Sequence, residues 1–120
     1  MELRIHDTNG KKIAEIISDE VIINTVQDAL DIMGNANYQD ALNIILYEKN
    51  IIPAFFDLKT GLAGEILQKF SNYNMKLALV GEFGKYTSNS LKAFIIECNR
   101  GNRVFFVDDF QTALNKLLGD

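Results

Sequence analysis

Polar side chains follow two apolar runs of this 120-residue chain, Ile44 to Tyr47 and Leu77 to Val80, and they could bind a ligand or transfer a proton. Both runs are short and continuous, which is the pattern of a strand covered on both faces. In sheets of parallel strands, ligand sites lie in the loops at the carboxyl ends of the strands. We therefore predict a ligand rim, which we call the carboxyl rim, made of Tyr47, Glu48, Glu82, Lys85, Tyr86 and Ser88.

Carboxylates are the most numerous charged groups near this rim, and they could bind a hard cation or act as an acid–base pair. They belong to Glu48, Asp57, Glu82, Asp108 and Asp109. Their spacing matches no recognised metal motif, and helix caps or solvated loop charges also account for them. We favour that second interpretation and expect no metal and no cofactor.

The stretch from Gly84 to Ser88, Gly-Lys-Tyr-Thr-Ser, is faintly similar to a phosphate-binding loop. A Walker loop needs Gly-x-x-x-x-Gly-Lys followed directly by Ser or Thr. Here the first glycine is too close to the lysine, and Tyr86 follows it. The helix start at Ser88 could still hold an anion weakly, but turn and capping roles explain the stretch more simply.

Thr60 is a candidate regulatory hydroxyl. It lies between Lys59 and Gly61, with Asp57 shortly before it, at the start of an apolar helical stripe. A phosphate there would add about −1.5 to −2 charges at a helix start and would alter any docking surface around it. The simpler alternative is that Thr60 is a turn residue, and both interpretations stay open.

The single histidine and the single cysteine restrict the chemistry further. His6 lies on the first expected strand, far in sequence from every rim residue. This position argues against a His-centred hydrolytic triad or a zinc site with several histidines. Cys98 lies on the inner face of an expected helix, where a small core residue is a simpler interpretation than a nucleophile.

Composition indicates one soluble domain over residues 1–120. The chain is 48% hydrophobic and 23% charged, and its net charge of −4 with scattered basic residues argues against nucleic-acid binding. One cysteine cannot form an intramolecular disulfide, and the N-terminus lacks the apolar run of a signal peptide. No stretch is long and apolar enough to span a membrane, so we expect a cytoplasmic protein.

Periodicity predicts a β-hairpin followed by βα repeats. Leu3 to Asp7 and Lys12 to Ile17 are rich in strand formers, and Asn9-Gly10 between them is a hairpin-turn signal. Residues 44–47, 77–80 and 104–107 are the later strands, with a helical pattern before and after each. The order β-β-α-β-α-β-α-β-α implies an α/β fold with a mostly parallel sheet.

Capping residues and glycines mark the expected helix ends. Gly34 is the expected end of the first helix, and Gly101 ends the third. The expected N-caps of the first, third and last helices are Ser18 or Asp19, Ser88, and Asp108 or Asp109.

The stretch Phe55 to Phe70 is the centre of the predicted fold. An apolar stripe at helical period runs through it and predicts a helix packed on the sheet. The stripe comprises Leu58, Leu62, Ile66 and Phe70. Gly61 and Gly64 fall in the first turns, where helix propensity disfavours each by about 1 kcal/mol. We infer that something approaches the backbone closely there.

The run Phe-Phe-Asp-Leu-Lys-Thr-Gly at positions 55–61 is the most specific part of a resemblance that covers nearly the whole chain. The chain resembles a family of small bacterial proteins known only as a domain of unknown function. That resemblance implies no established activity.

The expected element order also resembles that of the STAS domains, the anti-sigma-factor antagonists. In those domains a strand leads to Asp-Ser-Ser/Thr-Gly-Leu at a helix start, and a partner kinase phosphorylates the residue before the glycine. Here Thr60, Gly61 and Leu62 match, with one extra residue after Asp57 and a longer preceding loop. The resemblance implies a single STAS-like domain with sequential strands, helices mainly on one face, and function through protein contacts.

We therefore predict a bacterial, non-catalytic regulatory or protein-binding module of STAS-like type. Thr60 would be its switch, and Asp57, Lys59, Gly61 and the loop Tyr47 to Phe56 would form the surface around it. The alternative is a small-ligand-binding protein or an enzyme that uses the carboxyl rim. A deep pocket would favour this alternative, and a flat rim would favour docking. A third interpretation is a structural or dimerising domain, so the expected partner is another protein or a second copy.

Overall fold

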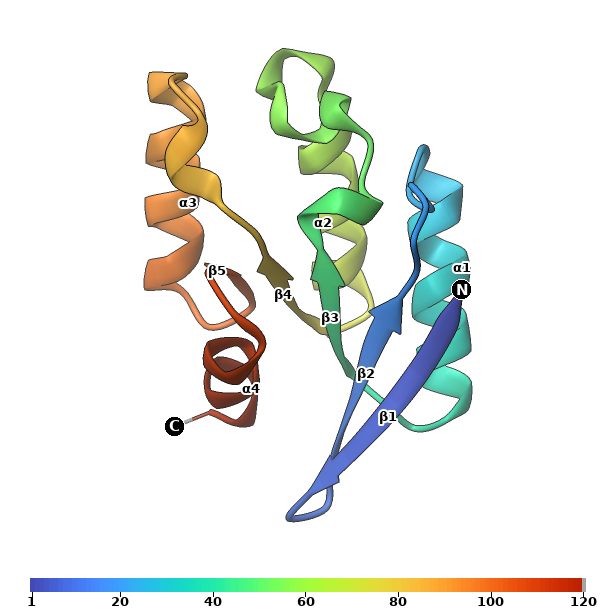
Figure 1. The fold of residues 1–120 in the computed structure, drawn as a ribbon. Coiled ribbons are helices and arrows are strands. Elements are labelled where there is room, and N and C mark those ends of the chain that lie inside the picture. Colours follow the sequence, from blue (N-terminus) through green and yellow to red (C-terminus); the bar gives the residue numbers. More distant parts are fainter. Residues whose placement is uncertain (120) are drawn as a thin grey trace.

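The computed structural model describes residues 1–119, in which five strands form one sheet in the order β1-β2-β3-β4-β5 (Figure 1). The strands are β1 (Glu2–Thr8), β2 (Lys11–Ile17), β3 (Asn43–Tyr47), β4 (Lys76–Val80) and β5 (Val104–Val107). The helices are α1 (Val26–Tyr38), α2 (Leu62–Asn72), α3 (Asn89–Arg100) and α4 (Phe110–Leu118). The predicted α/β class and element order are confirmed.

The N-terminal hairpin forms where the sequence predicts it. β1 pairs antiparallel with β2 in an unbroken register from Glu2↔Ile17 to Thr8↔Lys11. Asn9 and Gly10 make the two-residue turn with φ angles of 53° and 82°. Both residue types tolerate positive φ, which is why this pair closes the hairpin.

The other strands are parallel. β2 pairs with β3, β3 with β4, and β4 with β5, and Leu77 lies opposite both Ile44 and Val104. The three predicted runs are thus adjacent parallel strands, as expected. The carboxyl ends of these strands lie at the same end of the sheet, and the loops that carry the carboxyl rim begin there.

The helices cover the two faces of the sheet unequally. Residues of α1, α2 and α3 share the larger buried cluster, whereas Ala113 and Leu117 of α4 belong to a separate one. Neighbouring strand residues such as Ile44 and Ile45 contribute to different clusters, because side chains alternate along a strand. Figure 1 shows α1, α2 and α3 as a row along the sheet, with α4 apart from them. Helices mainly on one face were predicted, and this is confirmed.

The central helix buries its stripe but begins later than predicted. Ile66 and Phe70 are each 1% exposed, and Leu62 packs against the same cluster. Leu58–Thr60 forms a separate 3-10 turn. Gly61, with a φ of 78°, lies between this turn and α2 and prevents the two from forming one continuous helix. Gly61 is therefore explained by its own left-handed conformation. A Cβ on Gly64 would meet nothing within 4 Å, so no described part of the chain approaches that backbone closely.

The start and end predicted for α1 are wrong. Thr25 is the N-cap, and it forms a capping box with Asp28, which satisfies two free N–H groups at once. Ser18 instead accepts the N–H of Glu20 in a local turn ahead of the helix. The helix continues through Gly34, which is exposed with open space around it, so the glycine weakens the helix without ending it.

Candidate functional site

The carboxyl rim divides into two groups because Tyr47 and Glu48 turn to different sides of the sheet edge. Tyr47 packs against the buried cluster on the α4 face. Glu48 turns toward the loop after β4, which contains a short 3-10 turn at Phe83–Lys85. Each of the two side chains joins a separate polar network with its own geometry.

The first network, the Glu48 cluster, satisfies one carboxylate with three donors. The hydroxyl of Tyr86 donates to Oε2 of Glu48. Nζ of Lys85 lies 2.9 Å from the same oxygen, and the backbone N–H of Glu82 donates to Oε1 at 3.1 Å. The Glu48 side chain is only 13% exposed. The cluster therefore ties the loop after β4 to the end of β3.

The protonation states of this cluster are fixed by its contacts. Burial alone raises the pKa of Glu48, but the hydrogen bonds from Tyr86, Lys85 and Glu82 outweigh burial and lower that pKa below its ordinary value. Burial and the hydrogen bond to Glu48 raise the pKa of Tyr86. The carboxylate stays charged and the phenol stays protonated at neutral pH, so this pair acts as a clamp and is unsuited to proton transfer.

A shallow groove, the rim groove, lies beside the Glu48 cluster. Its volume is about 290 Å³, and its lining comprises Val21, Glu48, Lys49, Ile51, Pro53, Phe56, Lys85 and Tyr86. The rings of Phe56 and Tyr86 stack with centroids 5.3 Å apart and an interplanar angle of 20°. Aromatic stacking and the clamp together give the groove a fixed, largely apolar floor.

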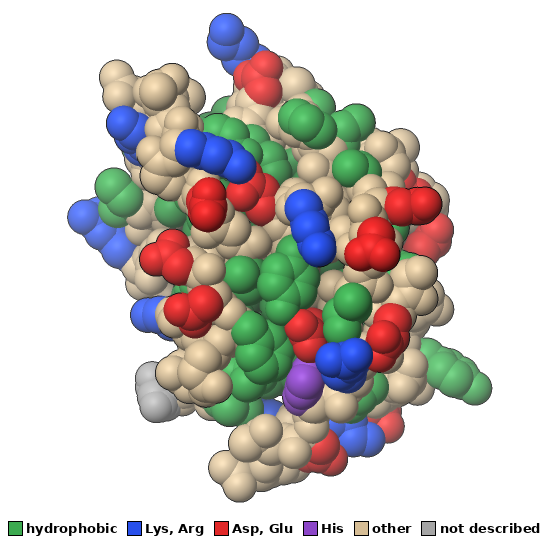
Figure 2. Space-filling view, viewed as in Figure 1, with side chains coloured by type: hydrophobic (Ala, Val, Ile, Leu, Met, Phe, Trp, Pro, Cys, Tyr) green, Lys and Arg blue, Asp and Glu red, His purple; other side chains and the backbone are tan. Residues whose placement is uncertain are grey.

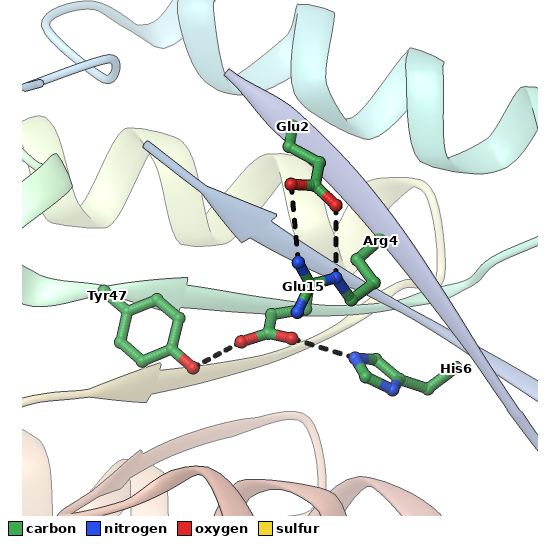
Figure 3. A network of polar contacts seen from close by, with 5 residues as sticks. All are labelled: Glu2, Arg4, His6, Glu15 and Tyr47. Carbon is green, nitrogen blue, oxygen red and sulfur yellow. Dashed lines mark hydrogen bonds and ion pairs between the residues drawn. The ribbon is translucent and has the colours of Figure 1, made fainter. Parts of the chain in front are cut away.

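The second network centres on Glu15, a residue that sequence analysis did not single out (Figure 3). The hydroxyl of Tyr47 donates to Oε2 of Glu15 at 2.5 Å, and Nε2 of His6 lies 2.9 Å from Oε1. Glu15 is 8% exposed. Burial and the hydrogen bond to Glu15 raise the pKa of Tyr47, so this phenol also stays protonated.

The hairpin brings His6 to Glu15, and through Glu15 into one network with Tyr47 of the rim, despite its distance from Tyr47 along the sequence. It pairs with Ile13, two residues before Glu15, and therefore shares the α4 face with Glu15. Figure 2 shows the single histidine at the lower end of a band of hydrophobic side chains, beside acidic and basic ones. The carboxylate stands between the phenol and the imidazole, so the order of groups differs from a Ser-His-Asp triad, whose histidine is central.

A small hollow, the Glu15 hollow, adjoins this network. It has a volume of about 190 Å³ and is lined by Glu15, Ile17, Ser18, Tyr47, Lys49 and Asn50. Asn50 is fully buried, and its Nδ2 donates to the carbonyls of Ser18 and Glu20 at 2.8 Å each. Its Oδ1 is buried and has no hydrogen-bond partner among the described residues.

The candidate switch Thr60 is exposed, but its hydroxyl is engaged. Oγ1 lies 2.7 Å from the carbonyl oxygen of Ala54 and 2.9 Å from that of Asp57, and it accepts the N–H of Leu62 at 3.2 Å. The side chain of Asp57 accepts the N–H of Lys59. Thr60 thus fastens the start of α2 to the turn Pro53–Phe56, whose ends line the rim groove.

The remaining predicted residues have capping or surface positions. Ser88 caps α3 by accepting the N–H of Leu91, and Asp109 caps α4 by accepting that of Thr112. Both caps were predicted. Glu82 and Asp108 are exposed. Over residues 1–119, no group of three or more His, Cys, Asp and Glu side chains is placed to hold a metal ion.

The structure is that of an α/β protein with two Glu–Tyr pairs, Glu48–Tyr86 and Glu15–Tyr47, each of which includes a residue of the carboxyl rim. The chain belongs to the family described as domain of unknown function DUF4180, whose sequence profile matches residues 8–117. No curated protein and no solved structure matches the chain. In the described part of the chain, no helix has both the length and the apolarity needed to cross a membrane.

Proposed function

We propose that this protein is a non-catalytic regulatory module that binds a partner protein through the rim groove. The observation that carries the proposal is the state of Glu48, whose carboxylate is held by Tyr86, Lys85 and the N–H of Glu82. The most buried charge of the groove is therefore used internally, and of its three charged lining residues only the exposed Lys49 is unpaired among residues 1–119. The groove is also shallow, which favours docking of a protein segment over enclosure of a small substrate.

The lining of the rim groove indicates the chemistry of its partner. Val21, Ile51 and Pro53 offer apolar contacts, and Val21 is 44% exposed. Lys49 is exposed and forms no ion pair with any of residues 1–119, whereas Lys85 is paired with Glu48. A partner segment with an apolar side chain next to a carboxylate would cover the apolar lining and pair with Lys49.

Thr60 is the proposed switch of this groove, in keeping with the resemblance to STAS domains. A phosphoester at Oγ1 has no hydrogen to donate, so the contacts with the carbonyls of Ala54 and Asp57 would be lost. The added charges would also repel those carbonyls and the Asp57 side chain. The turn Pro53–Phe56 would shift, and the groove would change shape because Pro53 and Phe56 line it.

The test is partner capture from the native cell, followed by affinity measurement with the purified partner. Lys49→Glu should weaken binding at least about tenfold, since reversing a complementary charge costs affinity. Lys92→Glu makes the same charge reversal at an exposed position of α3 and should leave binding unchanged. Thr60→Glu should weaken binding, whereas Thr60→Ser should retain it because the hydroxyl remains. Equal affinities for the wild type, Lys49→Glu and Thr60→Glu would contradict the proposal.

A second candidate function is small-ligand binding at the Glu15 hollow. It is favoured by the buried Oδ1 of Asn50, which has no partner among residues 1–119, and by the buried carboxylate of Glu15. Both are acceptors, so a ligand with an amino or hydroxyl donor would suit them. Screening small amines and polyols by nuclear magnetic resonance would test this candidate. Shifts around Tyr47 that disappear in Glu15→Gln would support it over the docking proposal.

A further inference from the structure

β1 is the outermost strand of the sheet, and its outer edge is open. It pairs with β2 alone, over seven residues that include no proline or glycine and no break in register. Backbone groups alternate between the two sides of an antiparallel strand. Because Thr8↔Lys11 closes the two-residue turn, the even-numbered residues bond to β2. The N–H and C=O groups of Leu3, Ile5 and Asp7 are therefore directed outward.

The two edges of the sheet differ in how well they are covered. All four residues of β5, the opposite edge, are buried. β1 contains no fully buried residue, and Leu3 and Ile5 are only partly covered although they pack against the main cluster. A regular, half-covered edge strand is a template for pairing with another strand. A strand added outside β1 would complete the burial of Leu3 and Ile5.

The charges on β1 are complementary to those of β1 in a second copy. Glu2 and Arg4 lie on one face of the strand, 56% and 54% exposed, and bond to each other at 3.1 Å (Figure 3). Antiparallel pairing centred on Leu3 sets Glu2 of each copy opposite Arg4 of the other. A centre at Arg4 would oppose two arginines, and a centre at Ile5 would oppose Arg4 and His6. Opposite charges stabilise a cross-strand pair and like charges destabilise it.

We propose that β1 is a homodimer interface, in which two copies pair antiparallel around Leu3 and join their sheets into one. The outward backbone groups of Leu3 then bond to those of Leu3 in the second copy. Two Glu2–Arg4 pairs flank this contact under the two-fold axis, as a self-complementary interface requires. The interface lies on the N-terminal hairpin and is independent of the partner proposed for the rim groove.

The test is sedimentation velocity over a range of protein concentrations, with charge-reversed variants. The wild type should associate to a dimer. Arg4→Glu alone, or Glu2→Arg alone, should weaken the dimer by about tenfold or more, because each change sets like charges opposite each other at two positions. Glu2→Arg combined with Arg4→Glu should restore the wild-type affinity to within about threefold. Reversing the exposed pair Glu97 and Arg100 on α3 is the control and should change nothing.

Amide hydrogen exchange provides a second measurement that does not depend on charge. The amides of Leu3 and Ile5 should exchange more slowly as protein concentration rises, while that of Arg4, already bonded to β2, should not change. Leu3→Pro removes an outward N–H and should abolish the dimer, with circular dichroism confirming that the fold is retained. A monomer at every concentration, or a dimer that tolerates each single charge reversal and leaves the Leu3 amide unaffected, would overturn the proposal.

Discussion

Gly81 lies directly against the side chain of Glu48. A Cβ on Gly81 would lie 2.6 Å from both Cβ and Oε1 of Glu48, and 3.1 Å from Cζ of Phe83. No residue with a side chain fits at these distances unless its neighbours move. The glycine therefore allows the loop after β4 to reach Glu48, whose carboxylate accepts the N–H of the next residue, Glu82. The close backbone approach inferred for Gly61 and Gly64 from the sequence occurs at Gly81 instead.

Replacing Gly81 should therefore destabilise the protein. We expect Gly81→Ala to cost about 1–3 kcal/mol of unfolding free energy, because the methyl group overpacks the contact with Glu48. Gly64→Ala is the matched control. It lies in α2 with nothing within 4 Å of the new methyl group, so it should stabilise by about 0.5–1 kcal/mol. Urea unfolding measures the free energies of both variants. Equal effects of the two substitutions would contradict the close contact between Gly81 and Glu48 as the reason for the glycine.

The stability contributed by Glu48 should depend on pH. Contacts in the folded protein lower the pKa of Glu48 below its ordinary value of 4.5. Its contribution is thus fully present above that ordinary value and is lost as the pH falls through the folded pKa. We expect Glu48→Gln to destabilise by about 1–3 kcal/mol at neutral pH. The gap to the wild type should narrow only below pH 4.5. A gap that is constant down to acid unfolding would show that the charge is unimportant.

Asn50→Asp should be strongly destabilising although the two side chains have the same shape. Nδ2 of Asn50 donates to the carbonyls of Ser18 and Glu20, and a carboxylate there would face two acceptors without a proton to share. We expect a loss of about 2–4 kcal/mol at neutral pH, since a buried charge would be left unpaired. Thermal unfolding should show partial recovery at low pH, where the carboxyl is protonated. Asn102→Asp, at an exposed position, is the control.

The buried stripe of α2 predicts the cost of a cavity. Ile66 is 1% exposed between α2 and the sheet, so Ile66→Ala should destabilise by about 2–5 kcal/mol. Ile96 on α3 is 52% exposed and provides the same substitution at the surface, where we expect a change within about 0.5 kcal/mol. Denaturant melts of the two variants compare the sites directly. Similar losses of unfolding free energy in Ile66→Ala and Ile96→Ala would mean that burial does not determine how much the stripe contributes to stability.

The sequence predicts the elements of this fold well because each depends on local pattern. Asn9-Gly10 sets the hairpin, and the apolar runs of β3, β4 and β5 are separated by helical periods. The start of α1 is harder to predict. Ser18, Asp19 and Thr25 are all acceptable caps by type, and only the reciprocal bond with Asp28 selects Thr25.

The candidate site was predicted only in part, because its networks join distant segments. Tyr86 and Lys85 were expected near Glu48 on the rim, but their donation to that carboxylate depends on the path of the loop after β4. Glu15 was missed, although a signal was present. A charged residue within the apolar run of β2, with the register fixed by Asn9-Gly10, places Glu15 near His6. Thr60 remains a predicted switch.

The sequential order of the strands has a consequence for how the protein is made. Each strand lies beside the strand that was synthesised just before it, so the sheet can grow by addition at one side as the chain leaves the ribosome. Strands that are neighbours in the sheet are also consecutive in the chain, so each pairing closes a shorter loop than it would in a sheet with a non-sequential strand order. α4 packs last, because it contacts β2 through β5 and must wait for all of them. Of the five strands β1 is synthesised first, and each later strand adds on the side away from it, so none of them covers its outer edge.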